Sequence, residues 1–261
     1  MSYQLAPNEN NFKFITNIPY GEQGTTSNLS HMNLPVFFYS EDYDAYPAEW
    51  LLNENEINFL RTLHISFEDS HKIEQETVKQ RLCDKWFAYN ALNHGIIYEP
   101  LAREKYENVL KFELRRNVCI RETGLVIQPN LFWVGASPDG MVIDREVGIG
   151  LIEIKCPKSK VSLLPEVLLN DEKFYMTWDN ENPSLRRNHE YFTQIQVAMG
   201  LSGALFCDFV VFTFGGIIIS RISFDEAYFI DVMKKINMFY RTHMLPKILS
   251  LSENNKTQNN N

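Results

Sequence analysis

Two short segments constrain the fold and the chemistry of this chain more than any other. Residues 135–140 are predicted to form a tight turn, and residues 151–155 an apolar strand. The turn carries one acid, Asp139, and the strand carries Glu153 and Lys155, an acid and a lysine two positions apart. Because side chains alternate between the two faces of a strand, Glu153 and Lys155 point the same way, about 7 Å apart. A hairpin-like return of the chain brings Asp139 beside them. The sequence therefore predicts an acid–acid–lysine site at the end of a strand.

These residue types suit a hard divalent cation. The carboxylates of Asp139 and Glu153 and the main-chain carbonyl of Ile154 form an all-oxygen donor set of the kind that Mg²⁺ prefers. Lys155 cannot ligate this ion, but it can hold a water molecule or a phosphate and stabilise the charge that develops in phosphoryl transfer. A structural alternative stays open, because residues 138–140 form a good turn on local grounds and the strand residues can simply face water.

Three blocks of sequence carry a resemblance to a known family. The order Ser-Pro-Asp-Gly at 137–140, a short spacer and Glu-x-Lys-Cys-Pro at 153–157 resembles the PD-(D/E)xK nuclease superfamily, and within it the phage lambda-type exonucleases and the YqaJ-like viral recombinase family. A Gly-x-x-x-Glu-x-x-Ala segment at 95–102 and a Tyr-x-x-Gln-x-Gln segment at 191–196 resemble the family in the same order. The resemblance implies an α/β (α+β) fold, with a restriction-endonuclease-like core in which helices flank a mixed central β-sheet.

The resemblance also implies an activity: hydrolysis of DNA phosphodiester bonds by a metal-dependent nuclease, as an exonuclease of the viral recombinase type that acts in DNA recombination and repair. Asp139, Glu153 and the Ile154 carbonyl match the positions that hold Mg²⁺ or Mn²⁺. Glu99 matches a further acid that helps to hold metal. Read by itself, Glu99 is better explained as an i,i+4 surface partner of Arg103.

A glutamine completes the predicted catalytic set. Gln194 matches the active-site glutamine of the family, and an amide can both donate to and accept from a metal-bound water or a phosphate. Read by itself, a glutamine on a helix is ordinarily a surface residue. With Lys155, Gln194 is expected to position the attacking water, while Asp139 and Glu153 supply the acids.

One departure from the family bears on the activity. The relatives usually carry an arginine and a Ser/Thr that bind the 5′-phosphate of a DNA end, between a Trp-bearing helix and the Gly-x-x-x-Glu helix. Here Trp86 and Gly95 are only nine positions apart, Asn90 stands at the expected arginine position and the Ser/Thr motif is absent. The alternative hypothesis is therefore a catalytically impaired DNA-binding or recombination accessory module, derived from a mobile element and lacking the 5′-phosphate pocket.

The net charge and the composition limit the kinds of molecule that this protein is expected to bind. A net charge of −8 argues against broad electrostatic attachment to nucleic acid but allows a local channel. Residues 158–188 interleave basic and aromatic side chains as a channel for a DNA duplex end or a single strand does, namely Lys158, Lys160, Tyr175, Trp178, Arg186 and Arg187. The resemblance also allows a homo-oligomer and a single-strand annealing partner.

The predicted setting is intracellular. Four widely spaced cysteines fit neither a structural zinc site nor a disulfide scaffold. No signal peptide and no transmembrane segment are expected, and nucleus and cytoplasm are not distinguished.

The chain is expected to form one main domain with appendages. Residues 1–70 are predicted to be an N-terminal extension, irregular over 1–45 with a helix over 47–63. Residues 71–250 are predicted to be the nuclease domain, and 251–261 a disordered polar tail. Within the domain, Gly95 is expected to end a helix over 73–92. The other predicted helices span 98–110, 188–200 and 224–249, and the strands span 118–122, 131–135, 141–144, 148–155, 205–214 and 217–222.

Overall fold

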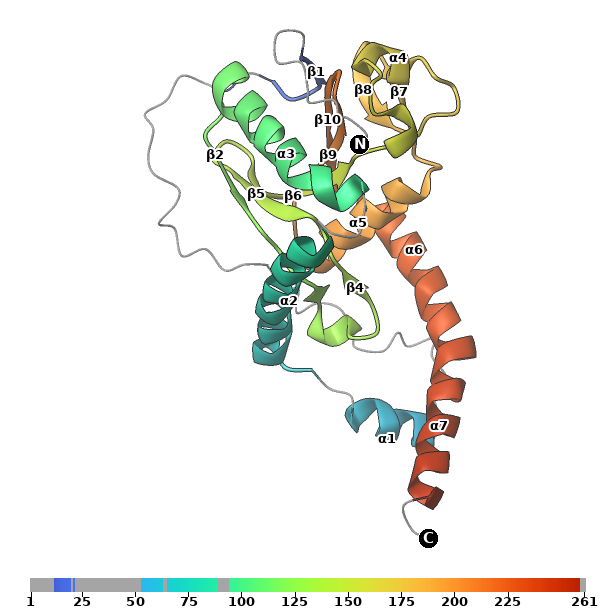
Figure 1. The fold of residues 1–261 in the computed structure, drawn as a ribbon. Coiled ribbons are helices and arrows are strands. Elements are labelled where there is room, and N and C mark those ends of the chain that lie inside the picture. Colours follow the sequence, from blue (N-terminus) through green and yellow to red (C-terminus); the bar gives the residue numbers. More distant parts are fainter. Residues whose placement is uncertain (1–11, 20, 22–52, 63–64, 89–93, 259–261) are drawn as a thin grey trace.

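The computed structural model describes residues 12–19, 21, 53–62, 65–88 and 94–258. Its centre is a six-stranded mixed sheet in the order β1-β10-β9-β6-β5-β2, with helices on both faces (Figure 1). The predicted fold class, α/β (α+β) with a mixed central sheet flanked by helices, is confirmed. The strands of this sheet are β1 Lys13–Thr16, β2 Val118–Arg121, β5 Gly140–Asp144, β6 Gly148–Lys155, β9 Phe206–Thr213 and β10 Gly216–Ser223.

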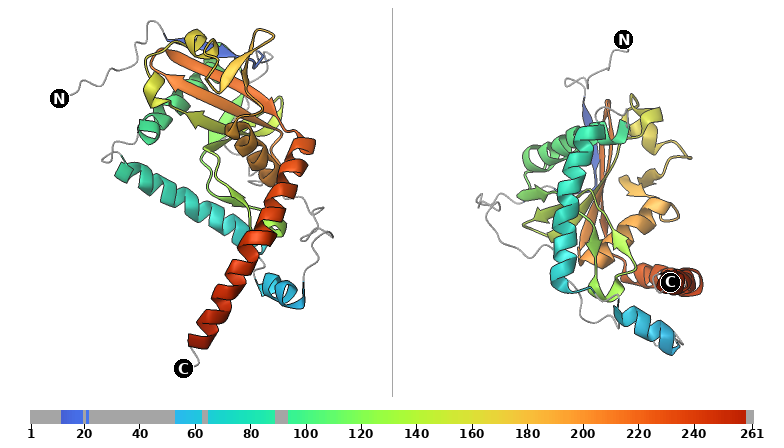
Figure 2. Two further views of the ribbon diagram at one scale, coloured as in Figure 1. Left: turned by 90° about the vertical axis from the view of Figure 1, so that its right-hand side faces the viewer. Right: turned by 60° about the horizontal axis from the view of Figure 1, so that its bottom comes forward.

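The helices cover the sheet unequally. They are α1 Glu54–Thr62, α2 Phe67–Ala88, α3 His94–Asn108, α4 Pro165–Leu169, α5 Glu190–Ser202, α6 Glu226–Phe239 and α7 Leu245–Gln258. Helix α3 lies on one face of the sheet and α4 and α5 lie on the other (Figure 2). Helix α6 continues through the π-helical segment Tyr240–Met244 into α7, and this long run extends past the sheet towards α1 (Figures 1 and 2).

Strand alternation divides the core into two parts. The α3-side core contains Ala102, Tyr106, Leu110, Ile152, Ile154, Val210, Phe212, Ile217 and Ile219, among others. The α5-side core contains Leu151, Phe192, Ile195, Met199, Phe209, Val211 and Ile218, among others. Because β9 is central and buried along its whole length, its residues supply both cores in turn. The register sends Ile152 and Ile154 to one side and Leu151 to the other, as the alternation predicts.

Two small hairpins complete the fold. One pairs β3 Val126–Ile127 with β4 Gly135–Ala136, and the other pairs β7 Met176–Asp179 with β8 Asn182–Leu185. The predicted strand over 131–135 is wrong for most of its length. A 3-10 turn, Pro129–Leu131, stands before it, and Phe132 and Trp133 pack instead against Tyr240 and its neighbours. Proline favours the start of such a turn because its φ is fixed.

The N-terminal part of the chain differs from the expectation of an irregular extension. Strand β1 pairs in parallel with β10, from Lys13 opposite Gly216 to Thr16 opposite Ile219. Helix α1 begins at Glu54 rather than at 47, because Asn53 and Glu56 form a capping box in which each side chain accepts from the backbone N–H of the other. Residues 47–52 lie outside the described part.

Two further expectations about element ends are corrected. Gly95 lies in the first turn of α3 rather than at the end of a preceding helix, and α2 ends at Ala88. Helix α7 runs to Gln258, so residues 251–258 of the predicted disordered tail are helical. The division into domains at residues 70 and 250 stays a prediction.

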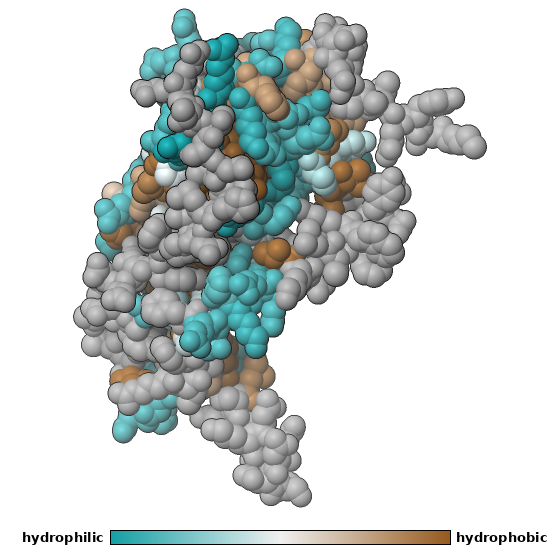
Figure 3. Space-filling model, turned by 90° about the vertical axis from the view of Figure 1, so that its left-hand side faces the viewer, coloured by the Kyte–Doolittle hydropathy of each residue, from teal (hydrophilic) through white to brown (hydrophobic). Residues whose placement is uncertain are grey.

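The described surface is mixed in character. In the view of Figure 3, hydrophilic residues are interrupted by separate apolar patches. Among the residues described, no helix combines the length and apolar character that crossing a lipid bilayer requires.

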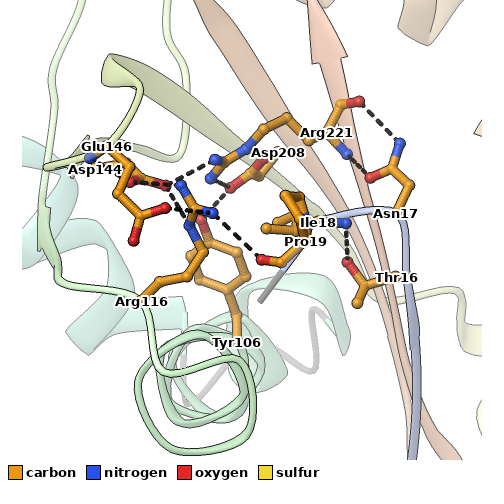
Figure 4. Close-up of polar contacts among 10 residues, drawn as sticks. All are labelled: Thr16, Asn17, Ile18, Pro19, Tyr106, Arg116, Asp144, Glu146, Asp208 and Arg221. Carbon is orange, nitrogen blue, oxygen red and sulfur yellow. Dashed lines mark hydrogen bonds and ion pairs between the residues drawn. The ribbon is translucent and has the colours of Figure 1, made fainter. Parts of the chain in front are cut away.

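A network of buried charges crosses the sheet beneath α3 (Figure 4). Arg221 donates from Nε and Nη2 to the two oxygens of Asp208, both at 2.7 Å, and from Nη1 to Asp144 at 2.7 Å. Arg116 donates to both oxygens of Asp144, at 2.8 and 2.9 Å. The hydroxyl of Tyr106 donates to Asp208 at 2.6 Å. Strands β5, β9 and β10, the segment before β2 and α3 are thereby joined through two carboxylates.

The N-terminal segment is attached to the same network. The Asn17 side chain accepts from the backbone N–H of Arg221 at 2.7 Å and donates to its carbonyl at 3.0 Å. Arg116 also donates to the carbonyl of Pro19 at 3.3 Å. Asn17 therefore continues the β1–β10 pairing with its side chain after the backbone ladder ends, and the charges hold the segment in place.

Ionisation of Asp144 links this network to stability. Burial alone would raise the pKa of Asp144, but hydrogen bonds from Arg116 and Arg221 outweigh burial and lower it. A carboxyl whose pKa is lower in the folded than in the unfolded protein stabilises the fold above the unfolded pKa, about 3.9. This contribution is lost as the pH falls through the folded pKa.

We expect Asp144→Asn to lower the free energy of unfolding by about 3 kcal/mol, because it removes the buried carboxylate that Arg116 and Arg221 share. Below about pH 4, wild type should lose stability more steeply than the variant, since the variant no longer carries this titrating group. Urea unfolding at a series of pH values measures both effects. The control is Asp231→Asn, which changes an exposed acid on α6. Equal stability of Asp144→Asn and wild type would contradict the assigned role of the network.

Candidate active site

A cavity lies where β6 extends beyond β5. The last paired residues are Gly140 of β5 and Ile152 of β6, so residues 153–155 continue past the end of the neighbouring strand. The cavity has a volume of about 360 Å³. It is lined by residues of β6, α3, α5 and the loops beside them: Gly95, Ile96, Glu99, Asp139, Glu153, Ile154, Lys155, Cys156, Pro157, Tyr175 and Tyr191. The predicted site residues Asp139, Glu153, Lys155 and Glu99 are thus brought to one cavity.

Asp139 is fixed beside β6 by its own backbone and side chain. Its N–H donates to the Ile152 carbonyl at 3.1 Å, and its Oδ2 accepts from the Ile154 N–H at 2.7 Å. Thr123 donates to the Pro138 carbonyl at 2.9 Å, which holds the turn. Because the N–H and C=O of one strand residue point to the same side, the Ile154 carbonyl also faces the side where Asp139 lies.

Glu153 is held by two donors. Its Oε1 accepts from Lys155 Nζ at 2.6 Å and from Gln194 Nε2 at 2.8 Å. The Glu153 side chain is only 6% exposed, whereas that of Lys155 is 22% exposed. Gln194, which is absent from the cavity lining, therefore reaches the site through Glu153. The two β6 side chains lie on one face, as alternation predicts.

Lys155 is a cation at neutral pH. Burial alone would lower the pKa of Lys155, but the Glu153 carboxylate outweighs burial, Asp139 adds to its effect, and the net shift is upward. The ammonium also lies over the Tyr191 ring, 4.4 Å from its centroid. Lys155 can therefore attract an anion and donate hydrogen bonds, and it is not suited to accept a proton.

Glu99 and Arg103 connect α3 to this site. Arg103 Nη2 lies 3.2 Å from Glu99, 2.5 Å from the Asp139 carbonyl and 3.5 Å from Glu122. The i,i+4 pair that local sequence suggested is therefore formed. It coexists with the position of Glu99 on the cavity, and Arg103 ties the helix acid to the turn that carries Asp139.

The donor atoms around the cavity are of the types that a divalent cation prefers. The arrangement of these side chains, however, is not that of a formed metal site. The available donors are carboxylate and carbonyl oxygens, which Mg²⁺ and Mn²⁺ prefer. In the described part of the chain, however, no three His, Cys, Asp or Glu side chains form a group that could hold a metal ion. Here Glu153 is bonded to Lys155 and Gln194, and Asp139 to the Ile154 N–H.

Sequence reasoning missed several residues of the cavity. Tyr191 lies three positions before Gln194 on α5, so helical spacing could have placed both on one face. Cys156 directly follows Lys155. Tyr175 was predicted only as an aromatic residue of a channel over 158–188, and nothing in the sequence placed it on this cavity, which the chain reaches there through the loop before β7.

The basic residues named for 158–188 do not line this cavity. Lys160 pairs with Asp171 at 2.6 Å and Arg187 pairs with Asp225 at 2.7 Å. Arg186 Nε donates to the Phe174 carbonyl at 2.8 Å. Of the residues named for this segment, Tyr175 is the one that lines the cavity. The segment therefore contributes structure and one aromatic side chain to the site.

Cys156 is not a nucleophile in this environment. Burial, then the nearby Glu99 and Asp139, raises the pKa of the Cys156 thiol to about 12. Because the thiolate is the reactive form of cysteine, the thiol is inert near neutral pH. The cavity thus combines acids and a cation, without an activated thiol.

We expect Cys156 to react slowly with iodoacetamide at about pH 8 in the folded protein, because its thiolate population is very small at that pH. Peptide mass spectrometry after timed labelling measures the rate at this residue. The same protein unfolded in urea is the control and should be labelled at the rate of an ordinary thiol. Equal rates in the two states would contradict the pKa assigned here.

The fold and the cavity define an α/β protein with two acids and a lysine at the end of a central strand. Residues 63–205 match the family model described as the YqaJ-like viral recombinase domain, and the chain belongs to this family. Among solved structures, the chain is similar to the crystal structure of LHK-Exo in complex with dAMP, with 26% sequence identity. The match covers 65% of this chain and 75% of that chain, with a TM-score of 0.46. No curated protein sequence matches significantly.

Proposed function

We propose that this protein is a metal-dependent DNA nuclease of the viral recombinase type that hydrolyses phosphodiester bonds, as an exonuclease in DNA recombination or repair. The observation that carries the proposal is the position of Asp139, Glu153 and Lys155 on one cavity at the end of β6. Membership in the YqaJ-like viral recombinase family supports it. The substrates proposed are a DNA duplex end or a single strand.

Asp139, Glu153 and the Ile154 carbonyl are the groups that would hold Mg²⁺ or Mn²⁺, with Glu99 as a further acid. The bound ion supplies neutralisation of phosphate charge and a more acidic water. The Glu153 carboxylate is already oriented by Lys155 and Gln194, and the Asp139 turn by Ile152, Ile154 and Arg103. The chain's own contribution is thus the orientation of these two acids before a substrate arrives.

Lys155 and Gln194 act on the substrate side. Lys155 remains charged, so it can bind a phosphate oxygen and stabilise developing negative charge. Gln194 shares Glu153 with Lys155 and can position a water through its amide. Neither residue has to accept a proton in these roles, which agrees with the raised pKa of Lys155.

The competing hypothesis is a DNA-binding accessory module that no longer cuts. It depends on the loss of the 5′-phosphate pocket, and the side chains concerned, Trp86 and Asn90, lie outside the described part. Homo-oligomer formation and a single-strand annealing partner also stay proposals. Cleavage assays separate the nuclease from the accessory module directly.

We expect wild type to cut linear duplex or single-stranded DNA with Mg²⁺ or Mn²⁺ and to stop when EDTA removes the metal. Asp139→Asn should lose at least about a hundredfold in rate while it folds normally, because the amide oxygen still accepts from Ile154. Lys155→Ala should lower the rate far more than the unfolding temperature. Gel assays of labelled DNA and thermal unfolding measure the two quantities.

Asp231→Asn is the matched control, because it changes an exposed acid on α6 and should cut like wild type. Undiminished cutting by Asp139→Asn would overturn the site assignment. If wild type binds DNA and never cuts it with either metal, the nuclease proposal fails and the accessory-module hypothesis is favoured.

A further inference from the structure

A buried hydroxyl group on the cavity has no partner among the described residues. The Tyr175 hydroxyl oxygen is buried and makes no hydrogen bond, although the residue lines the cavity with Lys155, Cys156 and Tyr191. Buried polar groups in proteins are nearly always paired, because an unpaired one loses its hydration without compensation. An unpaired hydroxyl at a site for a ligand indicates that the ligand supplies the missing partner.

The position of this hydroxyl is fixed by the packing of its ring. The Tyr175 ring contacts Tyr191 edge to face at 5.1 Å between centroids, Phe209 edge to face at 5.9 Å and His189 at 5.4 Å. Its backbone carbonyl accepts from the Arg186 N–H at 2.9 Å. The ring is held on several sides, so it cannot readily turn away to find a partner elsewhere.

The hydroxyl remains a donor over the working range of pH. Burial first, and then Tyr191 and Cys156, raises the pKa of Tyr175 far above its ordinary value. A neutral phenol donates one hydrogen bond. Its partner must therefore be able to accept a hydrogen bond.

The character of the cavity identifies that acceptor. Tyr191 contacts both Tyr175 and the Lys155 ammonium, so the hydroxyl and the cation belong to one side-chain cluster. The acids Glu99, Asp139 and Glu153 also line the cavity, and the proposed divalent ion would neutralise them. Beside that ion, a cation and a neutral donor suit an anion with several acceptor oxygens. For a DNA nuclease this anion is a backbone phosphate.

We propose that the Tyr175 hydroxyl donates a hydrogen bond to a non-bridging oxygen of a DNA phosphate bound at Lys155, and so positions the substrate. This inference rests on the proposed function, because it takes DNA as the substrate. It assigns a specific contact to a residue outside the acid–acid–lysine set. Tyr175→Phe removes only the hydroxyl and keeps the ring that packs on Tyr191.

The test compares wild type, Tyr175→Phe and Tyr228→Phe. Tyr228 is the matched control, because its hydroxyl pairs with Thr193 at 2.7 Å and it does not line the cavity. Each protein is assayed for single-turnover cutting of a fluorescein-labelled duplex oligonucleotide in Mg²⁺, for binding of the same oligonucleotide in Ca²⁺, and for thermal unfolding.

We expect Tyr175→Phe to cut with a kcat/KM roughly tenfold lower than wild type, the size of one hydrogen bond to a charged group. Its unfolding temperature should be equal to or above that of wild type, since the change removes a buried unpaired group. Tyr228→Phe should cut like wild type. A purely structural role for Tyr175 predicts the opposite pattern, a lower unfolding temperature.

A methylphosphonate at the scissile phosphate locates the contact, because it replaces one non-bridging oxygen by a methyl group. If Tyr175 contacts that oxygen, the effects of the modified DNA and of Tyr175→Phe will not add. Cutting and binding by Tyr175→Phe at wild-type levels would overturn the inference and leave the nuclease proposal intact.

The measurement of DNA binding in Ca²⁺ tests the Tyr175 contact independently of the nuclease activity. If wild type binds DNA without cutting and Tyr175→Phe weakens that binding, the nuclease proposal fails while the Tyr175 contact stands. If wild type neither cuts nor binds the oligonucleotide, both proposals fail.

Discussion

The fold depends on one buried constellation of charges. Asp144 ends β5 and Asp208 lies on β9, with β6 between them, and Arg221 bridges the two carboxylates across that strand. The bridge requires a residue without a side chain, Gly150, at the position on β6 beneath it. A Cβ at Gly150 would overlap the Phe206 ring, on which the Arg221 guanidinium stacks at 3.8 Å. Charges in this position cost much desolvation, and the multiple hydrogen bonds offset that cost.

The geometry of the candidate site depends on the strands that this charge network joins. Strand β6 is fixed between β5 and β9 at its first half, and its last residues extend beyond β5 into the cavity. Glu153 and Lys155 are therefore carried by a rigid strand, whereas Asp139 and Glu99 are attached by a turn and by α3 through Arg103. A constellation of this kind can be held in place before a substrate is bound, which is the condition for electrostatic stabilisation.

The elements that were predicted correctly are those whose residue pattern lies within one short stretch of sequence. Strand 148–155 was placed with correct bounds because apolar alternation and the turns beside it are strong, and the β9–β10 hairpin was placed within one residue at each end. Asp139, Glu153 and Lys155 followed from alternation and a turn, whereas Glu99 followed only from the family resemblance. The charge network could not be predicted, because Arg116, Asp144, Asp208 and Arg221 are far apart in sequence and only the sheet order brings them together. Tyr175 was predicted only as part of a basic and aromatic segment, and its place on the cavity could not be predicted because it depends on the packing of a loop against α5. Strand β1 is too short for a periodic signal, and its pairing partner lies at the other end of the chain.

That pairing has a consequence for the order of assembly. Residues 13–16 pair with residues 216–219, so the edge of the sheet closes only over a loop of nearly the whole chain. During synthesis, the N-terminal strand emerges long before its partner exists, and the pairing waits until β10 has left the ribosome. Until β10 is synthesised, the backbone groups of β1 lack their partner strand. During that time, association with other chains competes with folding. The Asn17 contacts and the buried charges that surround this junction thus can form only after β10 has been synthesised.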